Sequence, residues 1–172
     1  MPHSLAALNS CDRDAFVEAL GPLFEHSPWV AAETFGRRPF RDAESLHAAL
    51  CETMRGAPAG RRLALVRAHP DLAGRLAGAG ALTASSAGEQ SAAGLDRLTP
   101  AEAAEIGRLN GAYRARFGFP FVICARLNAK DAILAAMRSR VANTPEAELS
   151  TALGEIAKIA RLRLNEAIAK EK

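Results

Sequence analysis

The chain contains 172 residues, of which 49% are hydrophobic, 5% aromatic and 24% charged, and its formal net charge is +3. A chain of this length can bury a core without disulfide or metal cross-links, so we expect a soluble, helix-rich domain rather than a disordered segment. The arginine residues are scattered among acidic ones, which argues against nucleic-acid binding, and no stretch approaches the ~20 apolar residues of a membrane span.

The first predicted helix begins near Ser10 or Asp12. Its hydrophobic residues recur at helical spacing and would form one buried face, made of Phe16, Ala19, Leu20, Leu23 and Phe24. Pro28 then either ends this helix or starts the next one. We expect the neighbouring Trp29 to anchor the core rather than to contact a ligand.

Two further helices are predicted before residue 70. Asp42 can cap the first of them, which Gly56 would end, and its apolar positions are Leu46, Ala49, Leu50 and Met54. Residues 60–68 predict a short helix that packs through Leu63, Val66 and also Leu65. Because proline disfavours the α conformation in the residue before it, His69 is expected where this helix ends, with its ring in a turn.

The region from residue 71 to 87 is the least periodic part of the chain and contains several glycines. It predicts either a binding loop or a flexible connection, and residues 73–85 are our candidate for a segment that closes over a substrate. Ser86 followed by Glu89 then has the spacing of a capping box at a helix start.

Thr99, Pro100 and Glu102 repeat this capping pattern and predict a helix that Gly118 would stop. One face of this helix carries Ile106, Leu109, Tyr113 and Phe117. Residues 119–124, with the sequence FPFVIC, form the only strand-like apolar run.

The last two helices are expected to start at Asn128 and at Thr144. The final helix has apolar residues at Leu149, Leu153, Ile156, Ala160, Leu164 and Ile168. No internal repeat or linker is evident, so we predict an all-α fold in which residues 1–172 form a single compact domain of about eight or nine helices with one short extended apolar segment.

Five polar residues are candidates for chemistry, namely His69, Ser86, Glu89, Gln90 and Arg163. Taken singly, each has a structural explanation: a histidine before proline commonly donates a hydrogen bond at a helix end, and Ser86 and Glu89 are helix caps by default. A helix N-terminus can nevertheless bind an anion. Arg161 and Arg163 would point about 200° apart, so one is solvated while the other can face a cleft and pair with a carboxylate.

Several other site types have little support. The four histidines are widely separated and show no metal-ligand spacing, and the glycine-rich stretch LAGRLAGAGALT lacks a nucleotide-binding signature. The apolar surroundings of Cys124 argue against a nucleophile. Three cysteines without a CxxC pair favour a reducing, cytoplasmic setting, and neither an export signal at the N-terminus nor a peroxisomal address at the C-terminus is expected.

Five ordered segments resemble the 2-oxo-4-hydroxy-4-carboxy-5-ureidoimidazoline (OHCU) decarboxylases of urate degradation. The segments are FEHSPWVAAETF, AHPDLAGR, LTASSAGEQSAAGL, LTPAEAAEIGRLNGAYRARFGFPFVICAR and EIAKIARLRL. Several motifs in the same order are far more specific than any one of them, and the resemblance extends over nearly the whole chain.

The resemblance implies that His69 is the acid/base group, that Pro70 shapes the pocket, and that Arg163 contributes from the final helix. It implies that Ser86, Glu89 and Gln90 contact the substrate, with Ser85 as an alternative to Ser86. It also assigns substrate-binding backbone groups to Phe121, Val122, Ile123, Cys124 and Ala125. The resemblance further implies a homodimer that acts without a cofactor or a metal.

The reaction implied by the resemblance is the decarboxylation of OHCU to (S)-allantoin with stereospecific protonation. The substrate ring can itself accept the electrons released with CO2, so no separate electron sink is required. His69 suits the proton transfer because an unperturbed histidine has a pKa of ~6.5. The alternative from another class is a non-catalytic helical module that binds a purine or ureide. A helical DNA-binding domain is a more distant alternative.

Overall fold

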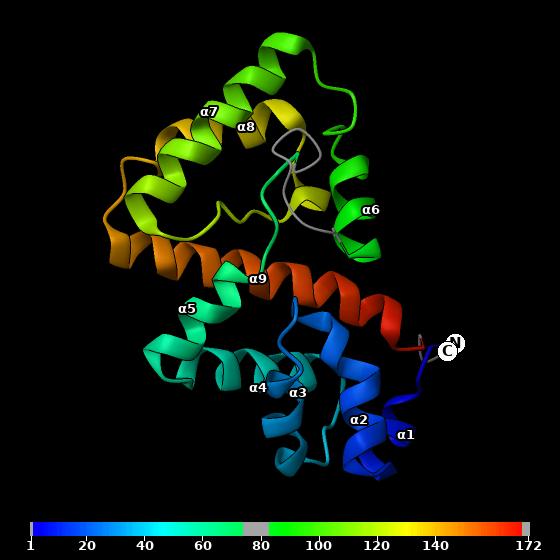
Figure 1. Ribbon diagram of the computed structural model, residues 1–172. Coiled ribbons are helices and arrows are strands. Elements are labelled where there is room, and N and C mark those ends of the chain that lie inside the picture. Colours follow the sequence, from blue (N-terminus) through cyan, green and yellow to red (C-terminus); the bar gives the residue numbers. More distant parts are fainter. Residues whose placement is uncertain (1, 74–82, 170–172) are drawn as a thin grey trace. The chain divides into compact units, whose positions relative to one another are not determined.

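The structure of the chain is a computed structural model that describes residues 2–73 and 83–169. These residues form nine α-helices and three short 3-10 helices (Figure 1). The α-helices are α1 (Leu5–Ser10), α2 (Arg13–Leu20), α3 (Trp29–Thr34), α4 (Ala43–Gly56), α5 (Ala59–Arg67), α6 (Ala84–Ala92), α7 (Pro100–Phe117), α8 (Lys130–Arg140) and α9 (Pro145–Ala167). The 3-10 helices are η1 (Gly21–Leu23), η2 (Phe35–Arg37) and η3 (Ala125–Leu127). The predicted all-α class is confirmed.

The chain divides into two compact units. Met1–Ala68 and Ile156–Lys172 make up the first unit, and His69–Glu155 makes up the second. Helix α9 is continuous, so its first part belongs to the second unit and its remainder to the first. No described helix is both long enough and apolar enough to cross a membrane.

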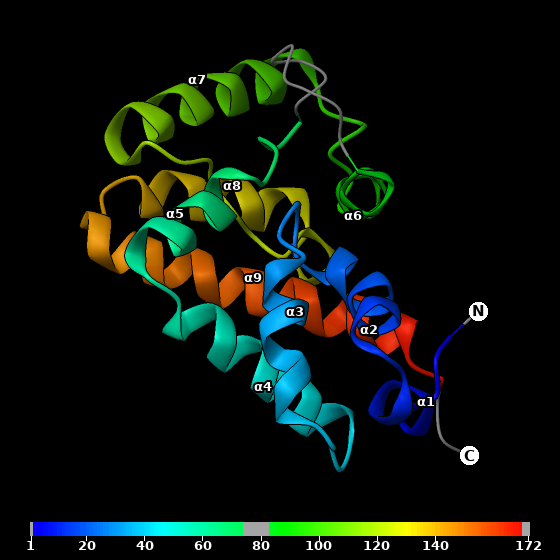
Figure 2. The same cartoon turned by 60° about the horizontal axis from the view of Figure 1, so that its bottom comes forward.

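The first unit is built from α1–α5 and the end of α9. Helix α3 packs against both α2 and α4 (Figures 1 and 2). The largest fully buried side chains of this unit include Phe16, Leu20, Leu46, Leu50 and Met54. At the edge of this unit the N–H of His3 donates to the carbonyl of Ala167 (2.8 Å), and the carbonyl of His3 accepts from Ala169 (2.9 Å). The two ends of the chain are therefore joined by backbone hydrogen bonds.

The second unit contains α6, α7, α8 and the beginning of α9. Its core includes an aromatic cluster in which the ring of Tyr113 on α7 lies 4.6 Å from Phe117, 5.9 Å from Phe119 and 5.4 Å from Phe121, measured between centroids. The cluster ties α7 to the segment that follows it. That segment, residues 119–124, is extended, as the apolar run predicts, and no strand pairs with it among the described residues.

Local capping signals explain many of the helix boundaries. Asp42 and Thr99 are N-caps with complete capping boxes, and Gly118 ends α7 in the left-handed conformation with φ 71°. The hydroxyl of Thr144 accepts from the N–H of Ala147 (3.2 Å) at the start of α9. The corresponding predictions are confirmed.

The helix predicted near residue 12 is shorter than its hydrophobic pattern indicates. Asp12 is its N-cap, but α2 ends at Leu20 and η1 follows, because Pro22 lacks the N–H that would continue the α-helix. Leu23 and Phe24 are still buried, although they lie outside α2. Helix α1 is an additional element that the sequence pattern does not indicate.

Two predicted helix starts differ from the structure. Thr83, not Ser86, caps α6: its hydroxyl accepts from the N–H of Ser86 (3.2 Å), which is the third residue of the helix. Helix α8 begins after Ala129, because the side chain of Asn128 instead donates to the carbonyl of Cys124 (3.0 Å). At α6 the hydroxyl of Thr83 takes the capping hydrogen bond, whereas α8 starts after Ala129 without a side-chain cap.

Two predicted core positions also differ. Trp29 is only half-buried, and the guanidinium of Arg61 lies 4.0 Å from the centroid of its ring, so Trp29 is not a core anchor. In α5 the fully buried residues are Leu65 and Val66, whereas Leu63 is half-buried. Most of the predicted closing loop, residues 74–82, lies outside the described residues.

Candidate active site

His69 lies directly after α5, where the proline that follows it is expected to end the helix. Ala68 caps α5 by donating its N–H to the carbonyl of Ala64 (3.0 Å), and His69 then opens an irregular segment. The exposed fraction of His69 is only 6%. Pro70 is half-buried beside it. A buried histidine on an irregular segment is a common arrangement at catalytic sites, although it also occurs in structural roles.

Two buried amide side chains hold the turn that follows His69. The Oε1 atom of Gln90 accepts from the N–H of Ala73 (2.8 Å), and its Nε2 atom donates to the carbonyl of Asp71 (3.5 Å). From α7, Nδ2 of Asn110 donates to the carbonyl of Leu72 (3.0 Å). Side chains from two helices therefore supply hydrogen bonds that this turn does not obtain from secondary structure.

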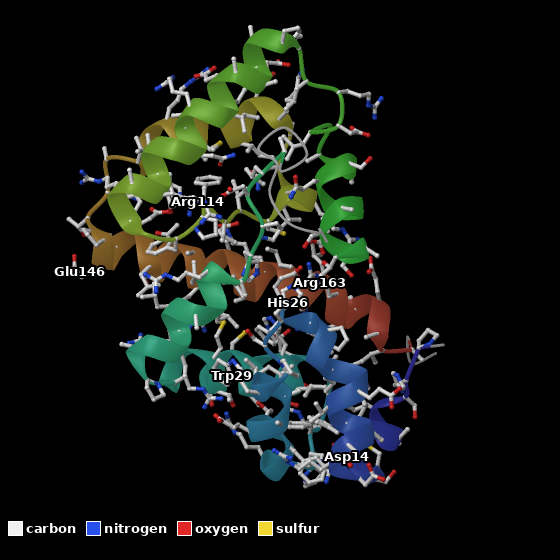
Figure 3. All side chains as sticks on the ribbon, viewed as in Figure 1. Asp14, His26, Trp29, Arg114, Glu146 and Arg163 are labelled. Atoms are coloured by element: carbon white, nitrogen blue, oxygen red, sulfur yellow. The ribbon has the colours of Figure 1, made fainter. Side chains whose placement is uncertain are left out.

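An ion pair fixes the same turn through its side chain. Nε of Arg114 donates to both carboxylate oxygens of Asp71, at 2.9 and 3.1 Å, and Figure 3 shows Arg114 on α7. The carboxylate is nearly buried, whereas the side chain of Arg114 is 46% exposed. Asp71 is thus engaged with the protein, and its role in this geometry is to hold the turn that carries His69.

Helix α6 presents a buried face with a serine and an amide. Ser86 and Gln90 are buried and lie one helical turn apart, while Glu89 is half-buried. Ser85 points to the exposed side of the helix. Of the two serines proposed for substrate contact, burial favours Ser86.

The extended segment from Phe121 to Ala125 is buried at every position. The N–H of Cys124 donates to Oε2 of Glu155 (2.8 Å), and the carbonyl of Val122 accepts from Nη1 of Arg140 (2.9 Å). These bonds replace the ladder that a neighbouring strand would supply. The conformation of this backbone is consequently set by charged side chains of α8 and α9.

Arg140 belongs to a larger buried network centred on Glu148. Nε and Nη2 of Arg140 donate to Oε1 of Glu148 at 2.8 and 2.5 Å, and Nδ2 of Asn143 donates to Oε2 at 2.8 Å. The hydroxyl of Tyr113 also donates to Glu148. Burial, followed by the hydrogen bond to this carboxylate, raises the pKa of Tyr113 well above its usual range. The phenol therefore stays protonated and serves as a donor.

Arg163 lies in the first unit, on the last part of α9 (Figure 3). Its Nη1 atom donates to Oε2 of Glu25 (3.0 Å) and to the carbonyl of Pro22 (3.4 Å). Arg161, two residues earlier, pairs with Glu44 at 2.5 Å, and the side chain of Glu44 is 69% exposed. Both arginines pair with a carboxylate, so the prediction that one of them is a solvated charge is wrong, whereas the predicted carboxylate partner of Arg163 is present.

The structure brings together part of the predicted residue set. Within the second unit, Gln90 binds the turn that directly follows His69 in the sequence. Ser86 lies on the same buried face of α6 as Gln90. Arg163 belongs to the other unit.

Sequence reasoning missed the supporting residues Glu25, Asn110, Arg140 and Glu155. Glu25 and Asn110 occur inside the quoted motifs FEHSPW and LNGAY, so the signal was present, but spacing alone does not reveal which polar residue a fold will bury.

Comparison with known proteins places these residues in a family context. A family model described as OHCU decarboxylase matches residues 9–165. A 2-oxo-4-hydroxy-4-carboxy-5-ureidoimidazoline decarboxylase from Amia calva is 45% identical over 94% of this chain and 92% of its own length. One from Haloferax volcanii is 42% identical over 98% of each chain.

A solved structure gives the same result for the fold. The crystal structure of an (S)-allantoin synthase superposes with a TM-score of 0.79 at 31% identity, over 98% of this chain. This chain spans 54% of that protein, about half of its length. The motifs, the all-α architecture and the matches over nearly the full chain agree, and this chain belongs to the OHCU decarboxylase family.

Proposed function

We propose that this protein is an enzyme that decarboxylates 2-oxo-4-hydroxy-4-carboxy-5-ureidoimidazoline to (S)-allantoin. The observation that carries the proposal is His69: the histidine of the family motif is buried and precedes a turn held by Gln90, Asn110 and Arg114. A general acid must be held in place to deliver a proton to one face of a planar intermediate. Family membership over residues 9–165 supports the same activity.

The reaction breaks one carbon–carbon bond and forms one carbon–hydrogen bond. As CO2 departs, the bonding electron pair delocalises into the conjugated C=N and C=O groups of the ring, and a proton is then added to the same carbon. The ring is the electron sink, so we propose that the enzyme requires no cofactor and no metal. The protein's tasks are to orient the carboxylate out of the ring plane, to stabilise the delocalised charge and to direct the proton.

We assign the proton transfer to His69, beside which Pro70 shapes the pocket. Ser86, Glu89 and Gln90 remain the proposed substrate-binding residues of α6, with Glu89 either orienting the imidazole or accepting from the ureido N–H groups. Backbone groups of residues 121–125 would bind the edge of the ring. The burial of the extended segment and of Ser86 supports these assignments.

Arg163 is proposed to donate to a ring oxygen or to the developing charge. An arginine that bound the leaving carboxylate strongly would stabilise the substrate more than the transition state and would slow the reaction. Replacement of Arg163 by alanine is therefore expected to lower kcat/KM, and an unchanged kcat/KM would remove this assignment.

The decisive experiment generates the unstable substrate in place from urate with the two preceding enzymatic activities and follows allantoin by circular dichroism. The protein should produce one enantiomer rapidly, and His69→Gln should lower the rate by at least ~100-fold while keeping the fold. His3→Gln, at an exposed histidine, is the matched control and should retain full activity. Racemic product at the protein-free rate would reject the enzyme and favour the purine- or ureide-binding module.

We also propose that the protein is a cytoplasmic homodimer. The family resemblance supports a dimer, and Leu127, with an exposed fraction of 58%, is a large apolar side chain that a partner subunit could cover. The three cysteines, all free thiols, support a reducing compartment. Light scattering should give twice the 18.2 kDa chain mass, and a monomeric mass across micromolar concentrations would contradict the dimer.

Residues 1–172 are further proposed to work as one domain, because the matched family region runs through both compact units and α9 belongs to both. Far-ultraviolet and near-ultraviolet circular dichroism should then report a single coincident unfolding transition. Two separated transitions would show that the units unfold independently.

A further inference from the structure

A buried ion pair joins Glu25 and Arg163 within the first unit. The side chains of Glu25 and Arg163 are 2% and 6% exposed, and Nη1 of Arg163 lies 3.0 Å from Oε2 of Glu25. The same Nη1 atom donates to the carbonyl of Pro22 at 3.4 Å. The guanidinium is therefore held by the protein, and its orientation about α9 is restrained.

Stability alone is a weak explanation for this pair. Transfer of two charges from water into a protein interior costs about as much as their attraction returns, and apolar replacements of buried pairs are often neutral or stabilising. Arg161, on the same helix, pairs with Glu44 of α4, whose side chain is 69% exposed, so α9 can also hold an arginine without burying a carboxylate. We therefore look for the role of buried Glu25 in the proposed function of Arg163.

Charge compensation provides that role. The substrate is an anion whose carboxylate leaves as neutral CO2, so its negative charge moves from the carboxylate into the ring during the reaction. A bare buried guanidinium would attract the carboxylate most strongly before the reaction, which opposes catalysis. A guanidinium paired with a carboxylate has a smaller net field and still presents directed hydrogen-bond donors.

We propose that Glu25 is a positioning residue that fixes Arg163 and offsets its charge, so that Arg163 stabilises charge on the ring without holding the carboxylate of the substrate. This inference rests on the proposed function, since it concerns how the same reaction is favoured. It assigns Glu25 an effect on the balance between substrate binding and turnover.

Glu25→Gln tests the proposal because glutamine keeps the shape and an acceptor oxygen while it removes the charge. We expect KM for the substrate to fall by ~10-fold and kcat to fall by ~10-fold or more, since the unbalanced guanidinium binds the carboxylate more tightly in the ground state. A residue with only a structural role would instead change the amount of folded protein, without this opposed movement of the two constants.

Binding of stable ligands provides a readout independent of turnover. Calorimetry is performed with hydantoin-5-acetate, which carries a carboxylate on a similar ring, and with uncharged (S)-allantoin. In Glu25→Gln the Kd of hydantoin-5-acetate should fall by ~10-fold, whereas that of (S)-allantoin should stay within about twofold. The double variant Glu25→Gln/Arg163→Gln should lose the tightened binding of the anion.

Glu44→Gln is the matched control, because it removes the carboxylate that pairs with Arg161 two residues from Arg163. It should leave both Kd values and both kinetic constants unchanged. If Glu25→Gln does not fold, Glu25→Asp, which keeps the charge but shortens the side chain, should show a smaller shift in the same direction.

The outcomes separate the two proposals. Equal anion affinity in the wild type and in the Glu25 variants, or unchanged KM and kcat, would overturn the role of Glu25. Absence of decarboxylation by the wild-type protein would overturn the proposed function, and the calorimetric comparison would still measure whether Glu25 weakens anion binding.

Discussion

The side-chain amide of Gln90 uses both of its ends on the backbone after His69. It accepts from Ala73 and donates to Asp71, and it is 91% buried, with an exposed fraction of 9%. Both contacts hold the turn that follows His69. At the scale of single residues, the position of His69 therefore depends on buried amide side chains. A sequence motif does not show that these side chains hold the turn after His69.

Replacement of Gln90 by leucine separates a positioning role from direct substrate contact. The variant leaves the N–H of Ala73 and the carbonyl of Asp71 without this partner, so the free energy of unfolding should fall by about 1–3 kcal/mol. Displacement of His69 should lower kcat, and loss of the proposed contact between Gln90 and the substrate should raise KM. Urea unfolding and steady-state kinetics measure the two effects.

An unchanged kcat together with unchanged stability would contradict the positioning role of Gln90. An unchanged KM would contradict its proposed contact with the substrate. Ser85→Ala, on the exposed side of α6, is the control and should alter neither stability nor kinetics.

At the scale of elements, the segment from Phe121 to Ala125 is extended without a partner strand. Arg140 on α8 donates to its carbonyl at Val122, and Glu155 on α9 accepts from its N–H at Cys124. A backbone held by buried side chains in this way keeps one conformation only while the charges around it remain paired.

Arg140→Met should destabilise the protein strongly. Glu148 is fully buried, and the variant removes its charged partner, which is expected to cost about 3–5 kcal/mol in the free energy of unfolding. Arg138 lies on α8 as Arg140 does, but it is an exposed partner of Glu105, so Arg138→Met is the matched variant. It should leave the free energy of unfolding within the error of urea unfolding. Equal losses in both variants would contradict a special role for the buried network.

The N-terminal cap of α4 predicts a pH dependence. Hydrogen bonds from the backbone N–H of Ser45 and from Arg41 lower the pKa of Asp42 from 3.8 to about 2. Because the folded pKa is the lower one, the cap stabilises fully above pH ~4 and loses its effect as the pH falls through about 2.

Urea unfolding between pH 6 and pH 2 tests this contribution. Asp42→Asn keeps a capping oxygen but cannot titrate, so its stability should decline less steeply with acid than that of the wild type. Parallel pH profiles for the two proteins would contradict the assignment to Asp42.

At the scale of the whole molecule, α9 is the one described element shared by both compact units. Gly154 lies in the interior of this helix, directly before the last residue of the second unit, and a Cβ atom at this position would meet nothing within 4 Å. Glycine weakens a helix interior because it loses more backbone entropy on folding than alanine does.

Gly154→Ala should therefore stabilise the protein by about 0.5–1 kcal/mol and raise Tm by roughly 1–4 °C without loss of activity. Gly111→Ala, in α7 and equally unobstructed, is the comparison and should behave similarly. A selective loss of activity in Gly154→Ala would instead show that flexibility of α9 at this glycine is needed for turnover.

The sequence by itself determined the helical class and most helix boundaries, and it indicated the histidine that we propose as the acid/base group. Hydrophobic residues at helical spacing and the local caps Asp42, Thr99 and Gly118 act over a few residues, so their effect follows from neighbours in the chain. The family motifs in turn pointed to His69. Where two groups compete for one cap, as Thr83 and Ser86 do, local patterns did not decide between them.

Only the tertiary structure decided which polar residues are buried and what they bind. Glu25 meets Arg163 across 138 positions, Arg114 meets Asp71 across 43, and Asn110 meets Leu72 across 38. Such contacts depend on how helices pack, which no local spacing encodes, and the cost of burying a polar group is met only when its distant partner arrives. For this reason the sequence indicated the residue that we propose as the acid/base group, whereas the side chains that hold its turn and the partner of Arg163 became visible only in the fold.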